Sequence, residues 1–149
     1  MRFIFLIFIL SLTILISSIL FMIFFNNQKP YVVINGKYFN AEVAKTDKQK
    51  RIGLSKYNKI ANNFGMLFLY QTEDYYSFWM KDMKFPIDII FIRNGKIDTI
   101  FKNVDYPKDK DIKLKKYVPD SPSDMVFEIN AGLTSKYNFK KGDGVKIVY

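Results

Sequence analysis

The chain has 149 residues and a formal net charge of +9, and it contains neither cysteine nor histidine. These absences exclude disulfide bonds, thiolate nucleophiles, Cys/His zinc sites and imidazole general bases within this chain. Acid–base chemistry would therefore fall to carboxylates, tyrosines or a lysine. No recognition motif accompanies the positive charge, so we interpret it as a lysine-rich solvated surface and do not expect nucleic acid as a partner.

The N-terminal segment is strongly apolar. From Phe3 to Phe25 the run is broken only by serines and one threonine, and as a helix it would rise about 35 Å, enough to cross a hydrocarbon core of about 30 Å. A cleavable signal peptide is the alternative, but its apolar core is normally about 7–15 residues long and ends at small residues. This run ends in Phe24-Phe25-Asn26-Asn27. We expect an uncleaved transmembrane anchor over residues 1–27, with the N-terminus in the cytoplasm and the rest outside it.

The remaining chain has the pattern of one β-rich domain over residues 33–149, after a linker at 28–32. Asn35-Gly36 and Asn94-Gly95 each lie between two β-type runs, which is a strong hairpin signal. The expected strands, in chain order, are 31–34, 37–44, 65–70, 76–81, 87–93, 96–104, 124–130 and 144–149. This series predicts a mainly β fold, an antiparallel sandwich, jelly roll or barrel.

Two short helices are expected among these strands. Thr46 and Gln49 match a capping box, and Gly53 is a plausible stop, so the sequence predicts a helix from Asp47 to about Ile52. A single helical turn is expected within 133–139. The charged stretch 108–116 has no periodic pattern and is interpreted as a loop.

Five sequence blocks, in order, resemble the domain-of-unknown-function family 192. The most specific block runs from Phe78-Trp-Met-Lys81 through Pro86-x-Asp88-Ile-Ile-Phe91. The others are Phe39-x-x-Glu42-Val-Ala44-x-Thr46-x-x-Gln49-x-Arg51-x-Gly53-Leu54, Gly65-Met-Leu-Phe68, Glu128-x-Asn130-Ala-Gly132 and Gly142-Asp143. The chain departs from the family pattern at Ser55, Asp82 and Met83. The resemblance implies a compact sandwich or jelly-roll domain, often exported or anchored, and it implies no activity.

Asp88 is the first candidate for a site residue. Strand alternation places it on one face with Ile90 and Ile92, where a carboxylate is costly to bury unless it is paired or hydrogen-bonded. One interpretation is a ligand-binding or acid–base carboxylate. The other is a structural salt bridge with Arg51 or Lys81.

Trp79 and Lys81 form a second candidate group. In a strand they would share a face opposite Phe78 and Met80, and an exposed tryptophan beside a cation is suited to bind a sugar or a peptide. The alternative places Trp79 in the core.

Glu128 and Asn130 also share a strand face. If Glu128 approached Asp88, the two carboxylates would suggest a glycosidase. The candidate ligand-binding residues are therefore Arg51, Trp79, Lys81, Asp88, Glu128 and Asn130. No EF-hand-like spacing of carboxylates is present, and we expect neither a metal nor a cofactor.

The sequence favours a membrane-anchored binding or accessory module of the cell envelope, held by residues 3–25 and with a glycan or protein as its ligand. A carboxylate-based hydrolase acting on an envelope glycan is the second hypothesis. A purely structural interaction domain is the third. Whether the chain catalyses a reaction is left open.

Overall fold

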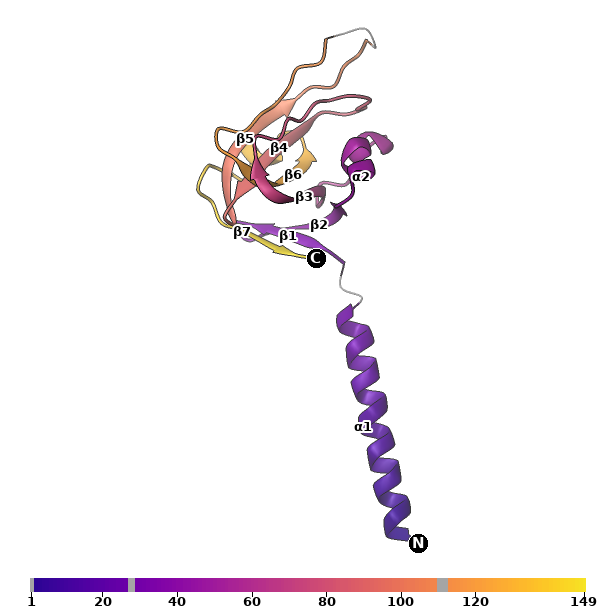
Figure 1. The fold of residues 1–149 in the computed structure, drawn as a ribbon. Coiled ribbons are helices and arrows are strands. Elements are labelled where there is room, and N and C mark those ends of the chain that lie inside the picture. The colour runs from indigo at the N-terminus through magenta and orange to yellow at the C-terminus, as the bar shows by residue number, and fades with distance from the viewer. Residues whose placement is uncertain (1, 27–28, 110–112) are drawn as a thin grey trace.

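The computed structural model describes residues 2–26, 29–109 and 113–149, and in its first helix it describes the side chains of residues 9–22. That helix, α1 (Arg2–Asn26), extends away from the β-rich part of the molecule (Figure 1). Within the described residues, no helix is both long and apolar enough to cross a membrane. The anchor over 1–27 therefore stays a prediction. Parts of the expected linker 28–32 and loop 108–116 lie outside the described residues.

Seven strands form one sheet in the order β5-β4-β6-β3-β2-β1-β7. Their bounds are β1 Tyr31–Ile34, β2 Lys37–Ala44, β3 Phe64–Asp74, β4 Ile87–Arg93, β5 Lys96–Val104, β6 Ser123–Asn130 and β7 Val145–Val148. Three short helices accompany them: α2 Asp47–Ile52, the 3₁₀ turn η1 Gly53–Lys56, and α3 Leu133–Lys136. The predicted mainly β class is confirmed.

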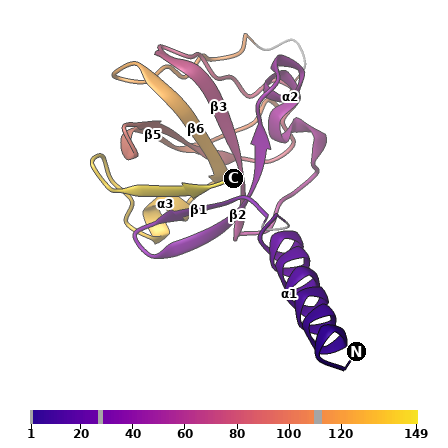
Figure 2. The same ribbon diagram turned by 60° about the horizontal axis from the view of Figure 1, so that its bottom comes forward.

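The sheet is a single curled layer and not a two-sheet sandwich (Figure 2). Every strand pair is antiparallel except β2 with β3, which are parallel because α2 and η1 carry the chain back between them. The two end strands approach each other where Lys96 forms a bridge with Gly144. The Ile97 N–H also donates to the Asp143 carbonyl, at 2.9 Å. The architecture is a half-barrel.

Local chemistry explains the element boundaries that the sequence predicted. Both Asn-Gly turns adopt positive φ at each central residue, with 48° and 73° at Asn35 and Gly36, as a type I′ hairpin requires. The capping box at the start of α2 is complete, because the Thr46 side chain accepts from the Gln49 N–H while the Gln49 side chain accepts from the Thr46 N–H. Gly53, with φ 51°, ends this helix.

The prediction of a strand over 76–81 is wrong. This segment only forms an isolated bridge between Phe78 and Tyr117, because it crosses a face of the sheet instead of pairing along an edge. Its side chains nevertheless alternate, with Phe78 and Met80 buried and Trp79 and Lys81 exposed. Nearby, Asp82 has φ 59°, a conformation that aspartate and asparagine tolerate better than most residues.

Both faces of the central strands are covered. On one face, Ile90 and Ile92 of β4 pack with Phe127 and with Leu133 of α3. On the other face, Ile89 and Phe91 pack with residues of η1 and of the 78–85 segment. The alternation predicted for β4 is confirmed, and Asp88 lies on the same face as Ile90.

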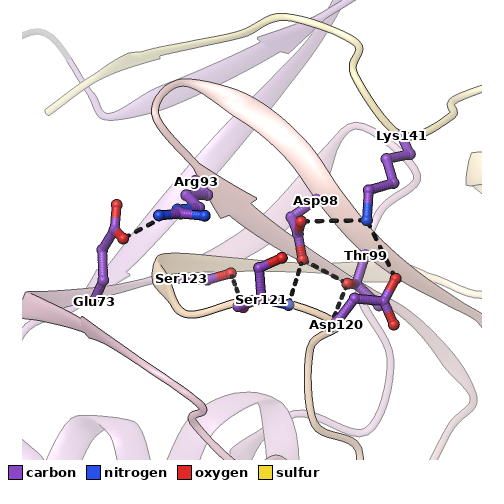
Figure 3. A network of polar contacts seen from close by, with 8 residues as sticks. All are labelled: Glu73, Arg93, Asp98, Thr99, Asp120, Ser121, Ser123 and Lys141. Carbon is purple, nitrogen blue, oxygen red and sulfur yellow. Dashed lines mark hydrogen bonds and ion pairs between the residues drawn. The ribbon is translucent and has the colours of Figure 1, made fainter.

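A polar network joins β5 to two distant segments (Figure 3). The Asp98 carboxylate accepts from the Thr99 hydroxyl at 2.7 Å and from the Ser121 N–H at 3.2 Å, and Lys141 pairs with both Asp98 and Asp120. Burial of Asp98 would raise its pKa, but these hydrogen bonds and the Lys141 charge together lower it. The network holds the chain before β6 and before β7 against β5.

Candidate functional site

A pocket of about 250 Å³ lies on the α2 side of the sheet. Aromatic side chains from β3 and from the 77–83 segment form its walls, with Phe68, Tyr70 and Phe78 among them. The pocket also brings together four of the six residues predicted from the sequence, which are Arg51, Trp79, Lys81 and Glu128. Asp88 and Asn130 are outside it.

Glu128 is the buried polar group of this pocket. It lies on β6, opposite Met66 of β3 and Ile89 of β4, and only 5% of its surface is exposed. Among the described residues, no hydrogen bond or ion pair reaches its carboxyl group. Burial raises the pKa of Glu128 to about 8, because desolvation penalises the charged form. At neutral pH the side chain is therefore a neutral acid that can both donate and accept a hydrogen bond.

Three cations line the pocket, Lys50 and Arg51 from α2 and Lys81 from the 77–83 segment. None of them has an ion-pair partner within the part of the chain that the structure describes. The Lys50 ammonium lies 4.0 Å from the centre of the Tyr70 ring, a cation–π contact. With Glu128 neutral, the pocket carries a positive charge that favours an anionic ligand.

Trp79 is half exposed, with 46% of its surface accessible, so the core alternative for this residue is wrong. It is the only tryptophan of the chain. Its exposed indole lies beside the cations of the pocket and is available to a ligand ring.

Asp88 has the structural role, but with partners that the sequence did not predict. Its carboxylate accepts from the N–H groups of Asn103, Gly132 and Thr134 at 2.7, 3.1 and 2.8 Å, and from the Thr134 hydroxyl at 2.7 Å. The predicted salt bridge with Arg51 or Lys81 is wrong, because both cations lie at the pocket on the other face. Asp88 is fully buried and holds α3 and the end of β5 against β4.

The carboxylate pair considered for a glycosidase does not form. Across β4 and β6, Asp88 stands opposite Ile129 while Glu128 stands opposite Ile89, so strand alternation directs the two carboxyl groups to opposite faces of the sheet. Asn130 donates to the Ile60 carbonyl at 3.0 Å and to the Asn62 side chain at 2.9 Å. In the described residues no group of three acidic side chains could hold a metal ion.

Sequence reasoning missed Lys50, Phe68 and Tyr70. The signal for Phe68 and Tyr70 is the alternation of β3, which places them on the face of Met66 and so of Glu128. Tyr70 stacks on Tyr76 with ring centres 3.5 Å apart, and burial raises the pKa of Tyr70. Its hydroxyl therefore stays protonated at neutral pH.

The family model DUF192, described as "Uncharacterized ACR", matches residues 31–147. The chain belongs to this family. A crystal structure of a protein of unknown function from Novosphingobium aromaticivorans DSM 12444 has a TM-score of 0.69 and 29% identity, over 78% of this chain and 83% of that one. A proposed transcription regulator from Sinorhizobium meliloti 1021 has a TM-score of 0.67 and 25% identity, over 79% of this chain and 91% of that one. No curated protein matches this chain.

Proposed function

We propose that this DUF192 protein is a ligand-binding module of the cell envelope, held at the membrane by its N-terminal helix. The observation that carries the proposal is the pocket beside α2. It combines a buried carboxyl group and three cations, all without a partner among the described residues, with an exposed tryptophan. A carboxyl group in this position can exchange hydrogen bonds with a bound ligand, and each such bond contributes about 0.5–1.5 kcal/mol.

The charges of the pocket support a binding role over a packing role. Lys50, Arg51 and Lys81 converge on one concavity beside exposed aromatic surface, whereas cations on an ordinary surface are spread among anions. Concave, mostly apolar pockets with a few convergent polar groups are where proteins bind small molecules.

The composition of α1 supports the membrane location. Its described large apolar side chains are exposed, for example Leu10 at 62%, Ile14 at 63% and Leu20 at 61%. Such a continuous apolar surface is unfavourable in water, and lipid would cover it. The apolar sequence of this helix continues on both sides, from Phe3 to Phe25.

The hydrolase hypothesis has less support than it had from the sequence. The pocket contains one carboxyl group, Glu128, whereas the usual glycosidase mechanism uses two that flank the scissile bond. The purely structural hypothesis does not account for a carboxyl group and three cations that lie together in one pocket and have no partner in the part of the chain that the structure describes.

Binding can be tested through the fluorescence of Trp79, since every tryptophan signal of this chain comes from the pocket. The full chain in mild detergent is titrated with a panel of glycan and peptide fragments prepared from cell envelopes. We expect at least one fragment to shift the emission, and Arg51→Gln to weaken its binding about tenfold or more. Lys84→Gln is the control, because Lys84 contacts Asn58 outside the pocket and its loss leaves the affinity unchanged. A panel without any response, or an Arg51→Gln variant that binds normally, contradicts the proposal.

The location is tested separately by fractionation. The full chain should stay with membranes after an alkaline carbonate wash, and a variant lacking residues 3–25 should be released. Release of the full chain by the same wash would contradict the membrane location while leaving the pocket untouched.

A further inference from the structure

Three features of the pocket beside α2 constrain the chemistry of its ligand, and each acts on a different part of the ligand. These features are the acid Glu128, which has no partner among the described residues, the cations Arg51 and Lys81, and the exposed face of Trp79. The inference below rests on the proposed binding function and adds the class of ligand.

The cations select for an anionic group. Arg51 and Lys81 make no ion pair with any described residue, and Glu128 is too far from both to form one. A guanidinium group offers two parallel N–H donors that match a carboxylate or a phosphate. An amine ligand would be repelled by the same charges.

Glu128 selects for a hydroxyl group. The neutral acid carries one O–H donor and acceptor oxygens, all without partners in the described residues, and it is the most buried polar side chain of the pocket lining. A hydroxyl group of a ligand can accept the acid proton and donate to the acid carbonyl at once. A carboxylate can only accept, and a methyl or aromatic C–H can do neither, so each of these would leave part of Glu128 unsatisfied.

Trp79 and the volume of the pocket set the size and shape. An indole face packs well against a flat apolar surface such as the C–H face of a sugar ring. The volume of about 250 Å³ is below the range of roughly 300–1,000 Å³ that drug-sized ligands occupy, so one ring with its substituents fills it.

We infer that the pocket binds one acidic sugar residue, with its anionic group on Arg51 and Lys81, its ring against Trp79 and a ring hydroxyl on Glu128. A uronic acid and a sugar phosphate share this chemistry. A neutral sugar lacks the anion, and an aromatic carboxylate lacks the hydroxyl.

The test uses four probes that separate these features: methyl glucuronide, glucose 6-phosphate, methyl glucoside and benzoate. Each is titrated into the full chain while Trp79 fluorescence is followed. We expect methyl glucuronide or glucose 6-phosphate to bind at least about tenfold more tightly than methyl glucoside and than benzoate. The acidic sugar that binds more tightly shows whether the pocket prefers a carboxylate or a phosphate group.

Variants then assign each contact. Arg51→Gln should lower the affinity for the acidic sugar about tenfold or more and leave the affinity for methyl glucoside unchanged. In Glu128→Met the methionine side chain has a length similar to that of glutamate but no strong hydrogen-bonding group. This variant should lower the affinity for both sugars and leave the affinity for benzoate unchanged. Glu128→Gln keeps a donor and an acceptor and should retain most of the affinity.

Two outcomes overturn the inference in distinguishable ways. If benzoate binds as tightly as the acidic sugars and Arg51→Gln weakens it, the pocket is a binding site and only the sugar class is wrong. If the acidic sugars bind but neither Arg51→Gln nor Glu128→Met changes their affinity, they bind elsewhere, and the proposed function of the pocket fails as well.

Discussion

Glu128 and Asp88 lie on neighbouring strands, are both buried, and have opposite surroundings. Asp88 accepts four hydrogen bonds, whereas Glu128 accepts none from the described residues. An aspartate with four donors is satisfied by the fold itself, whereas a glutamate that receives no hydrogen bond from the described residues has its carboxyl group available to a ligand. This contrast is the reason why we assign a structural role to Asp88 and propose Glu128 as the ligand-binding carboxyl group.

Glu128→Gln should stabilise the protein at pH 7 by on the order of 3 kcal/mol. Between pH 4.5 and about 8 the folded protein keeps the Glu128 proton that the unfolded chain releases, so stability is highest at low pH and falls as the pH rises through this window. Urea unfolding at pH 5 and pH 8 should show this loss in the wild type and less of it in Glu128→Gln. Glu73→Gln, at an exposed pair with Arg93, should leave the pH dependence as it is, and an unaltered slope in Glu128→Gln would refute the prediction.

Asp88→Asn should destabilise the domain by roughly 3–5 kcal/mol, because the new amide group presents a donor to a site already filled by donors. The measurement is denaturant unfolding. Asp143→Asn is a matched control, since Asp143 also accepts from a backbone N–H but is only half-buried, and it should cost much less. If Asp88→Asn had normal stability but lost ligand binding, the structural role of Asp88 would be contradicted and a binding role supported.

Residue chemistry also explains how much of the site the sequence could predict. Arg51, Glu128 and the pair of Trp79 with Lys81 were predicted independently of one another, and the fold brings them to one pocket. Their meeting depends on β3 and on a segment that crosses the sheet, which is long-range information that alternation along single strands does not contain.

Among the elements, hairpins and helix caps were predictable and strand partners were not. The α2 helix has its predicted bounds because its cap and its stop are local. The 76–81 segment has the composition and the alternation of a strand, but strand formation requires a hydrogen-bonding partner along its length. The parallel pairing of β2 with β3 likewise cannot be predicted from the local sequence.

Close contact between β3 and β6 leaves no room for a side chain at Gly65. A Cβ atom at this position would lie 2.5 Å from the Phe127 ring and 2.6 Å from the Glu128 carbonyl oxygen. Gly65→Ala should therefore push the two strands apart and cost about 3 kcal/mol, which thermal or denaturant unfolding will measure. At Gly144 nothing lies within 4 Å of such an atom, so Gly144→Ala should change stability little. Equal stability of the two variants would show that the strands are not packed this closely.

For the whole molecule, closure of the half-barrel combines backbone contacts with the Asp98 network. The bridge from Lys96 to Gly144 and the ion pairs of Lys141 join segments that are far apart in the sequence. The mainly β class followed from composition and from turn spacing. The single curled sheet did not, because the order of strands in a sheet is set by contacts between distant segments.

Asp98→Asn should destabilise the protein at pH 7 by about 1–2 kcal/mol. The folded pKa of Asp98 is lowered, so its contribution is present above the unfolded value of about 4 and is lost as the pH falls through the folded value. The variant and the wild type should thus differ in urea unfolding at pH 7 and converge near pH 2. Asp120→Asn, which removes an exposed partner of Lys141, should have a smaller effect, and a difference that persists undiminished in acid would contradict this account.

The proposed binding site depends on Glu128 being a desolvated acid that pairs with none of the described residues. The most direct measurement is the carboxyl carbon resonance of Glu128, followed by NMR over the pH range. We expect a titration midpoint near 8 in the ligand-free protein, and a shift of that midpoint when an acidic sugar binds. A midpoint at the ordinary value of 4.5 would contradict it, because the carboxyl group would then be solvated or paired and would need no ligand.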